Sequence, residues 1–349
     1  MKHLRVLFMF VVFSVLFVLN TKTVSEAAEL KGAKEQFKVN MQNVEKKFKV
    51  HRMQEFHIIG NDFYMTQRFA NNKDNVENDV AILKFTIANN VASYSAGNYM
   101  IIEDSGHGET LDAYTYDKKT YFLIGNKGGD DKEHYSHQIG RVEYKKGKTI
   151  NYTSLARLTG FDFANKKGVN NGKVLRVAAC ASTNRIRFIT FLDKKNDNNK
   201  YQKCIQISEY DLGDLNTVLN KKPTSYTTFE GNKALKDACK SWQLVWRKAG
   251  VNELPNDSFQ GMEAKNDSIY FAGGAEDNLY PAIWRMTNGT WDSKRTIQSY
   301  VSIDNKTIST KNTEIEGLCI KDDTLHFGIV NSMSNIHIVS VPLKNFNNN

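Results

Sequence analysis

A short pattern recurs along this 349-residue chain and restricts its fold more than any other feature. The segment SFQGMEAKNDSIYFAGG (258–274) is echoed by EIEGLCIKDDTLHFGIV (314–330) and, more loosely, by MQEFHIIGNDFYMTQ (53–67). In each copy a polar residue precedes a turn rich in Asn and Asp, and a short apolar strand follows; these polar residues are Gln260, Glu316 and Gln54. A single small sheet cannot bury both of its faces, so the copies are expected to pack on one another.

Two further segments raise the number of such units to five. Their apolar strands are TYFLIGN (120–126) and IRFITFLD (186–193), and each of the five units continues with a second strand, mostly of alternating apolar and polar residues. The aromatic anchors of the units are 58, 66, 83 and 56 residues apart: Tyr64, Phe122, Phe188, Phe271 and Phe327. The predicted fold class is all-β, a five-bladed β-propeller, because radially stacked sheets cover one another and leave only short edges. A pair of β-sandwiches is the alternative, and it does not explain the recurring pattern.

The longest interval between anchors is expected to hold a short helical insertion near 211–250. In DLGDLNTVLNK (211–221) one helical face carries Leu212, Leu215, Val218 and Leu219. The segment NKALKDACKSWQLVWRKAG (232–250) is also predicted to be helical, with Trp242 and Trp246 one turn apart among basic residues. We expect this face to pack on a blade; the alternative is peripheral contact with a membrane through 232–250.

The first 27 residues have the features of a secretory signal peptide. A basic start precedes the apolar run VLFMFVVFSVLFVL (6–19), and small residues follow at Ser25 and Ala27. The run is shorter than the ~20 residues of a membrane-spanning helix, which favours cleavage near Ala27 over a membrane anchor. The predicted organisation is a signal peptide at 1–27 and a single propeller domain at 28–349, secreted from the cell.

The formal net charge is +9, and cleavage after Ala27 leaves about +7 on the mature chain. Positive charge draws a secreted protein to anionic surfaces such as teichoic acid or anionic lipid, while export argues against nucleic acid as a partner. An even number of cysteines in an exported chain permits disulfides; the four are Cys180, Cys204, Cys239 and Cys319. The first two lie on neighbouring predicted strands and can pair, but other pairings and four free thiols remain open.

Six segments in a fixed order carry a family resemblance. They are SGHGETLDAY (105–114), YFLIGNK (121–127), HQIGRVEY (137–144), YDLGDLNTVL (210–219), SFQGMEAKNDSIYFAGGAED (258–277) and NTEIEGLCI (312–320). Together they resemble the helveticin J family of class III bacteriocins. The resemblance implies a secreted antibacterial protein that binds the envelope of related bacteria, with teichoic acid or another anionic glycopolymer as ligand. The chain departs from the family at Arg176 and Ala178, where a His-x-Glu pair is usual, and at Leu111, where a Trp is usual.

A propeller would bring one or two polar residues of each unit to a common central channel. The candidate ligand-binding residues of this channel are Gln54, His107, Glu109, Arg176, Gln260, Glu314 and Glu316. They can bind a polar ligand or a cation at the channel mouth. They can also hydrogen-bond backbone groups of adjacent blades, which is the role we favour, because buried polar groups require partners.

No motif for a nucleophile with its base, a zinc protease or a P-loop is present in the sequence. We therefore expect no enzyme, no catalytic residues, no metal and no cofactor. The loop GGDDKEHYSH (128–137), with His134 and His137 three residues apart, is expected to be solvated rather than metal-binding. The first hypothesis is a non-enzymatic antibacterial protein. The alternatives are a wall-binding protein or adhesin without killing activity, and a propeller polysaccharide lyase or hydrolase that uses carboxylates such as Glu314 and Glu316.

Overall fold

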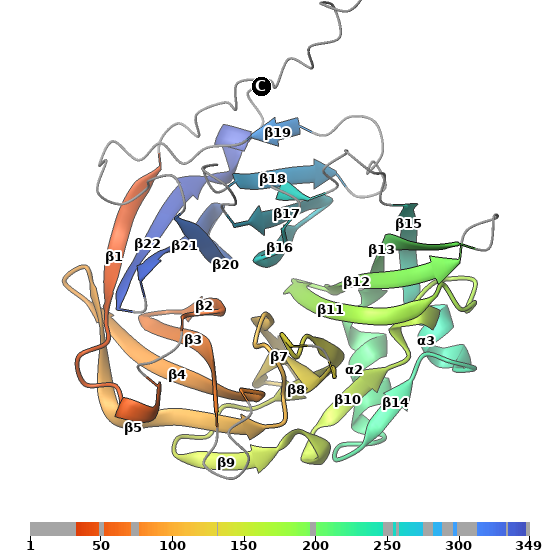
Figure 1. Cartoon of the computed structure of the whole chain (residues 1–349), viewed down its shortest axis with the longest axis horizontal. Helices are drawn as coiled ribbons and strands as arrows, with labels where there is room; N and C mark the ends of the chain where they lie inside the picture. Colours follow the sequence, from red (N-terminus) through yellow and green to blue (C-terminus); the bar gives the residue numbers. More distant parts are fainter. Residues whose placement is uncertain are drawn as a thin grey trace, which may run out of the picture.

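A computed structural model gives the structure of this chain. It describes residues 33–48, 52–70, 77–130, 132–195, 200–246, 254–255, 258–274, 282–287, 296–298, 313–332 and 334–346. Its strands form small sheets arranged around a common centre (Figure 1). The all-β, propeller-like class predicted from the repeat is confirmed, and the alternative of two sandwiches is wrong. The predicted signal peptide lies outside the described residues.

The described strands group into antiparallel units that follow the repeat. The first unit consists of β2 (Glu55–Ile59), β3 (Asp62–Phe69), β4 (Asp79–Ala88) and β5 (Val91–Glu103). The second consists of β6 (Leu111–Tyr116), β7 (Lys119–Gly128), β8 (Ser136–Val142) and β10 (Ala156–Thr159), with β14 (Tyr226–Thr228) added in parallel. The third consists of β11 (Lys173–Ser182), β12 (Arg185–Lys195), β13 (Tyr201–Asp211) and β15 (Cys239–Trp246).

The remaining strands complete the ring. The fourth unit consists of β16 (Gly261–Lys265), β17 (Ser268–Gly273), β18 (Ala282–Thr287) and β19 (Thr296–Gln298). The fifth consists of β20 (Glu314–Lys321), β21 (Thr324–Ser332), β22 (Asn335–Pro342) and the N-terminal strand β1 (Lys34–Asn40). Strand β9 (Lys148–Asn151) pairs with β5, and short 3-10 turns occur at η1 (Lys46–Phe48), η2 (Tyr152–Ser154), η3 (Phe161–Phe163) and η5 (Leu343–Phe346).

Strand β1 joins the two ends of the described chain. It pairs antiparallel with β22, where Val39 lies opposite Ile336, and parallel with β5, where Val39 lies opposite Ala92. The first and fifth units therefore share one continuous sheet of nine strands. Because β1 has a hydrogen-bonded neighbour on each side, the ring closes without an open edge at this junction.

The first strand of each unit lines the centre of the ring. These inner strands are in contact all the way round, in the order β2, β6, β11, β16, β20 and back to β2. In four units the hairpin from the inner strand to the next turns through left-handed backbone. Three of these turns were predicted and contain Gly60, Asn266 and Asp322, and the second unit turns at Lys118. The hairpins place one end of every inner strand on the same side of the ring.

Apolar clusters lie between neighbouring units. Phe271 of the fourth unit packs with Ile189 of the third, and Phe327 of the fifth packs with Tyr270 of the fourth. All five predicted aromatic anchors are buried, and each lies on the second strand of its unit: Tyr64, Phe122, Phe188, Phe271 and Phe327. Burial between sheets, rather than within one sheet, is what makes each unit depend on its neighbours.

The insertion in the third unit is only partly helical. Helix α2 (Leu212–Asn220) begins at the N-cap Asp211 and buries the predicted apolar face. Helix α3 (Lys233–Ala238) is short, because the chain continues directly into strand β15, which pairs with β13. The predicted helix over 232–250 is therefore wrong from Cys239 to Trp246. The amphipathic helix that the membrane-contact alternative required is not formed over these residues either. Residues 247–250 lie outside the described residues.

Trp242 and Trp246 lie on strand β15 instead. Trp242 is opposite Ser208 and Trp246 is opposite Cys204 in the pairing with β13. Lysine ammonium groups lie over both indole rings, Lys167 at 5.7 Å from one centroid and Lys194 at 5.9 Å from the other. The rings therefore cover the outer part of the third unit, where cation–π contacts hold them.

The four cysteines are free thiols, and all of them are buried. The pairing of Cys180 with Cys204 that the sequence permitted is not formed, since these residues lie on β11 and β13 with strand β12 between them. In the part of the chain that the structure describes, no helix has the length and apolarity needed to cross a bilayer.

Candidate functional site

The predicted channel residues gather where the inner strands begin. We call this side the entry mouth and define it by Glu109, Arg176, Gln260, Glu314 and Glu316. The opposite side, where the inner hairpins turn, is called the turn mouth. Gln54 and Gln260 occupy equivalent positions of their units, as the repeat predicts. The backbone N–H of Gln54 donates to the carbonyl of Thr66, and that of Gln260 donates to the carbonyl of Ala272.

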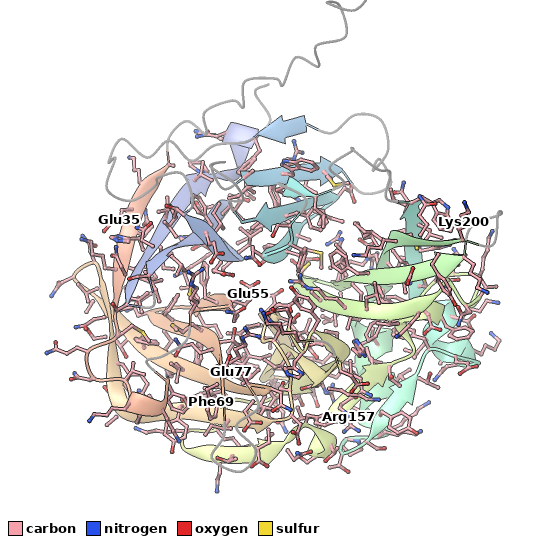
Figure 2. The ribbon with its side chains drawn as sticks, viewed as in Figure 1. Glu35, Glu55, Phe69, Glu77, Arg157 and Lys200 are labelled. Atoms are coloured by element: carbon pink, nitrogen blue, oxygen red, sulfur yellow. The ribbon has the colours of Figure 1, made fainter. Side chains whose placement is uncertain are left out.

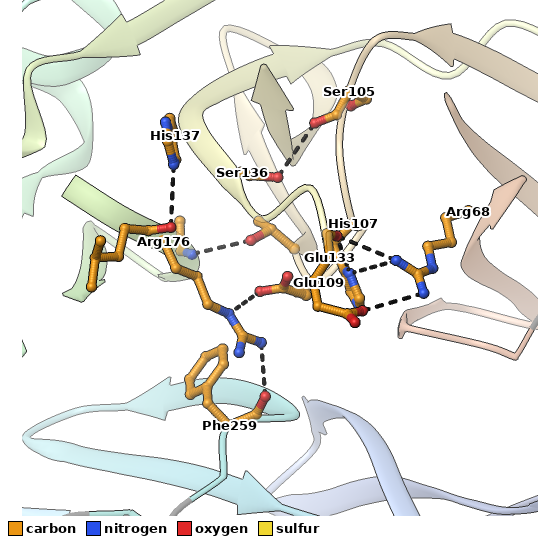
Figure 3. A network of polar contacts seen from close by, with 12 residues as sticks. Arg68, Ser105, His107, Glu109, Glu133, Ser136, His137, Arg176 and Phe259 are labelled. Carbon is orange, nitrogen blue, oxygen red and sulfur yellow. Dashed lines mark hydrogen bonds and ion pairs between the residues drawn. The ribbon is translucent and has the colours of Figure 1, made fainter. Parts of the chain in front are cut away.

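Glu109 and Arg176 form a buried ion pair between the second and third units (Figure 3). The side chains are 5% and 11% exposed. A second N–H of Arg176 donates to the carbonyl of Phe259 at 2.7 Å, which ties in the fourth unit. The rings of Tyr135, Phe191 and Phe259 lie 4.3, 5.5 and 4.7 Å from the guanidinium carbon. Arg176 is therefore a cation shared by three units.

A second group of polar residues links the fourth, fifth and first units. The side-chain amide of Gln260 lies 3.5 Å from the carboxyl of Glu316. The backbone carbonyl of Gln260 accepts from the N–H of Gly317 at 3.0 Å. Glu314 forms an ion pair with Arg52, whose carbonyl accepts from the amide of Gln54 at 3.4 Å. These contacts join the fourth unit to the fifth and the fifth unit to the first.

The contacts of His107 are with groups outside the entry mouth. Its Nδ1 lies 3.1 Å from a guanidinium nitrogen of Arg68 and 2.7 Å from the carbonyl of Glu133, between the first and second units (Figure 3). Burial lowers the pKa of His107 to about 3, and the nearby Arg68 and Arg176 also lower it, while the carbonyl of Glu133 opposes the change. His107 is thus a neutral imidazole that holds a loop.

Glu316 is a titratable group of the entry mouth that its surroundings perturb strongly. Burial raises the pKa of Glu316 well above its usual range; repulsion from Glu314 adds to the rise, and Arg52 and Arg176 oppose it. A buried carboxyl group with a raised pKa holds its proton at a pH where an exposed glutamate is ionised. Its neutral form is therefore the one that the fold stabilises.

The raised pKa of Glu316 predicts that Glu316→Gln gains stability over the wild type as pH rises. The contribution of Glu316 is fully present below its unfolded pKa of about 4.3 and is lost as pH rises through the higher folded pKa, with a slope of up to about 1.4 kcal/mol per pH unit. Urea unfolding from pH 4 to pH 8 measures the difference. Glu314→Gln is the control, because Glu314 is more exposed and paired with Arg52. A difference between Glu316→Gln and wild type that stays constant with pH would contradict this assignment.

A cavity of about 820 Å³ adjoins the entry mouth between the second, third and fourth units. Arg176 and the aromatic rings of Tyr135, Phe191 and Phe259 line its inner part. Its outer part is lined by three lysines with exposed side chains, which are Lys132, Lys173 and Lys203. Aromatic faces beside cationic groups suit a ligand that has sugar rings and negative charges.

The loop 128–137 forms one wall of this cavity. His134 contacts the carbonyl of Gly129 at 2.9 Å, and His137 contacts the carbonyl of Leu175 at 3.2 Å. The two histidines thus hold backbone groups of different elements. The prediction that this loop is no metal site stays a prediction.

A set of residues deeper in the channel is absent from the candidates named from the sequence: Glu55, Asp112, Glu263 and Cys319 are buried, and His57 is half-buried. Glu55 lies near the middle of the ring, whereas Glu35 and Lys200 lie at its periphery (Figure 2). Its carboxylate accepts from the N–H of Phe56 at 3.0 Å and of Leu318 at 2.8 Å, across the junction of the first and fifth units. A Cβ at Gly317, where φ is +78°, would lie 2.3 Å from this carboxylate, so glycine is required there.

These missed groups perturb one another strongly. Burial raises the pKa of Glu55 and of Glu263 well above their usual range, and the neighbouring Asp112 adds to both effects. Burial opposes the charged form of His57, but Cys319 and Asp112 together raise the pKa of that imidazole well above its usual range. The signal that could have located these residues is the repeat itself: His57, Asp112, Glu263 and Cys319 each stand three positions after a predicted channel residue.

The family model described as Bacteriocin helveticin-J matches residues 28–331. The chain belongs to the helveticin J family. No curated protein gives a match to this chain.

Several solved structures are similar in fold to this helveticin J family member. One is the α-L-arabinofuranosidase PaAbf62A of Podospora anserina in complex with cellotriose, at 9% identity over 90% of this chain and 98% of that chain, with a TM-score of 0.43. Another is a GH43_1 enzyme of Xanthomonas citri complexed with xylotriose, at 9% identity over 88% and 90%, with a TM-score of 0.43. An acylaminoacyl peptidase of Pyrococcus horikoshii matches at 9% identity over 81% of this chain but 44% of that chain, with a TM-score of 0.35.

These neighbours correct one expectation. They are glycoside hydrolases and a peptidase, so enzymes occur on folds of this kind, and the expectation that the protein is no enzyme does not stand. At such low identity the likeness concerns the fold alone and assigns no activity to this chain.

Proposed function

We propose that this helveticin J family member is a secreted antibacterial protein that binds an anionic glycopolymer of the target cell envelope at its entry mouth. The observation that carries the proposal is the cavity of about 820 Å³, which combines three lysines with three aromatic rings. Teichoic acid is the polymer class that fits, since it carries sugar or polyol units joined by phosphates. Family membership supports an antibacterial role.

Four cationic side chains line the cavity against the two carboxylates of Asp130 and Glu133, and this net positive charge suits a polyanion rather than a neutral sugar. Lys173 and Lys203 stand on strands β11 and β13, each opposite Asp193 of the intervening strand β12. Their exposed ammonium groups flank the aromatic wall, as adjacent phosphates along a polymer would require. The net charge of about +7 on the mature chain adds a long-range attraction toward an anionic wall, and this attraction weakens as salt rises.

The double substitution Lys173→Glu with Lys203→Glu is expected to weaken binding to teichoic-acid-bearing cell walls by about 30-fold. Each lysine near an anionic surface contributes about 1 kcal/mol, and two together give this factor. Sedimentation of labelled protein with purified Gram-positive walls measures the affinity. Walls stripped of teichoic acid are expected to bind the wild type as weakly as intact walls bind the variant.

The matched control is Lys146→Glu with Lys148→Glu. Lys148 lies on the peripheral strand β9 and Lys146 lies just before it; both are exposed, and neither lines the cavity. The control changes the net charge by the same amount as the test variant. An equal loss of binding in both double variants would show that net charge, and not the entry mouth, binds the wall. An inhibition-zone assay on related Gram-positive bacteria tests killing separately, and a protein that binds walls without inhibiting growth would be an adhesin.

Hydrolysis of a wall polysaccharide is the second candidate function, and Glu316 is the observation that favours it. A buried carboxyl group with a raised pKa can donate a proton to a glycosidic oxygen, and Glu314 and Glu109 are close enough to influence its pKa. Release of reducing sugar from purified walls tests this activity. Glu316→Gln is expected to stop that release while binding to walls is retained. If the wild type releases no reducing sugar, hydrolysis is ruled out and wall binding is the function that is left.

A further inference from the structure

Four potential metal ligands converge at the centre of the ring, and they come from four different inner strands. His57 lies on β2, Asp112 on β6, Glu263 on β16 and Cys319 on β20. The Nδ1 atom of His57 lies 2.8 Å from a carboxylate oxygen of Asp112 and 3.8 Å from the sulfur of Cys319. Ligand atoms of His57, Glu263 and Cys319 all lie within 4.8 Å of one another.

The repeat gives these residues a common position. Each stands three residues after a channel residue of its own unit, so His57 follows Gln54, Asp112 follows Glu109, Glu263 follows Gln260 and Cys319 follows Glu316. Equivalent positions of a closed ring face one axis. The convergence is therefore a property of the whole ring and involves residues up to 262 positions apart.

Backbone groups hold both carboxylates in place. Glu263 accepts from the N–H of Ala264 at 2.8 Å and, through its other oxygen, from the N–H of Ile320 at 3.2 Å. Asp112 accepts from the N–H groups of Ala113 and Ala181. A carboxylate has about four acceptor sites, so these bonds orient each group and still leave lone pairs for a cation.

The buried carboxyl groups around the site also suit a cation, which would stabilise their ionised forms. Glu55, Asp112 and Glu263 are 4%, 5% and 3% exposed. Among the ion pairs of the described residues, none joins these three carboxylates to a lysine or an arginine, and His57 is the partner of Asp112. Buried carboxylates are costly unless they are paired or coordinate a metal. A cavity of about 410 Å³ at the turn mouth, lined by His57, Asp112 and Glu263, gives an ion a route to them.

We propose that His57, Asp112, Glu263 and Cys319 bind one Zn²⁺ ion on the axis of the ring. A thiolate and an imidazole select zinc or a similar transition metal over Mg²⁺ and Ca²⁺, which prefer oxygen ligands. A tetrahedral zinc site places nitrogen and sulfur ligands about 3.5 Å apart, close to the separation of His57 and Cys319. The ion would fasten the first, second, fourth and fifth units at their inner edges. This inference does not depend on the proposed function.

The test is metal binding by the full chain, purified under reducing conditions and without chelators. We expect about one zinc per chain by elemental analysis, and a lower unfolding temperature after chelation that added Zn²⁺ restores. Replacement of zinc by Co²⁺ is expected to give thiolate-to-metal charge-transfer absorption together with the visible bands of a tetrahedral site. Cys319→Ser should remove the charge-transfer absorption and weaken Zn²⁺ affinity by more than about 100-fold.

Cys239→Ser is the matched control, because Cys239 is also buried but lies on β15, away from the axis. It is expected to keep both the absorption and the zinc. If Cys319→Ser does not fold, Glu263→Gln replaces it, with zinc affinity as the readout. A folded wild type that takes up no stoichiometric zinc or cobalt, or a charge-transfer band that survives in Cys319→Ser, would overturn the proposal.

Discussion

Val39→Asp is expected to lower the free energy of unfolding by about 4 kcal/mol or more. Val39 is 4% exposed and lies on β1 between β5 and β22, where it belongs to the apolar cluster of the first and fifth units. An aspartate there would be buried without a partner at the strand that closes the ring. Since domains of this kind have about 5 to 15 kcal/mol of stability, the variant is expected to lose a large share of it.

Lys38→Asp is the control within the same strand. Lys38 is the neighbouring residue and is exposed on the opposite face of β1, so its replacement removes no apolar contact. Urea unfolding followed by circular dichroism compares the two variants, and limited proteolysis shows whether the first unit is released. If Val39→Asp is as stable as Lys38→Asp, strand β1 does not hold the ring closed.

The architecture could be predicted because its signals are local. Each aromatic anchor lies on an apolar strand directly after a turn, and Phe271 and Phe327 show this pattern most clearly. These features depend on residues a few positions apart, where periodicity and turn chemistry act. The order of units around the ring then follows from the order of the repeats.

Strand β15 could not be predicted because a distant partner decides its structure. The segment from Cys239 to Trp246 has apolar residues that suit a helix as well as a strand. Pairing with β13, where Trp246 lies opposite Cys204, satisfies its backbone groups and completes the third unit. Tertiary context of this kind overrides local propensity.

Only part of the candidate site could be predicted, because some of its contacts join residues that are far apart in the sequence. The repeat located Glu109, Gln260 and Glu316 at one mouth, because equivalent positions face one axis. It did not reveal that Glu109 is paired with Arg176, since no sequence spacing encodes a contact between residues 67 positions apart. The prediction about metal ligands followed local spacing in the loop 128–137, whereas Asp112 and Glu263 are 151 residues apart. The position three residues further along each repeat carries the signal for them.

Glu109→Ala is the second large prediction, with an expected loss of about 3 to 5 kcal/mol of stability. The substitution leaves the guanidinium of Arg176 buried at the meeting point of three units, with the carbonyl of Phe259 and three aromatic rings as its remaining contacts. Glu143→Ala is the control, because Glu143 forms an ion pair with Lys119 in which both side chains are exposed, and no measurable change is expected there.

The double variant Glu109→Ala with Arg176→Met separates two roles of the pair. If the pair is structural, removal of both charges costs less than the two single changes added together, because neither charge is left buried alone. If Arg176 instead binds a ligand that Glu109 only orients, the double variant should fold well and lose wall binding as completely as Arg176→Met alone. Chemical unfolding and wall sedimentation on the same four proteins distinguish these outcomes. Additive losses of stability would contradict the ion pair as the link between the second and third units.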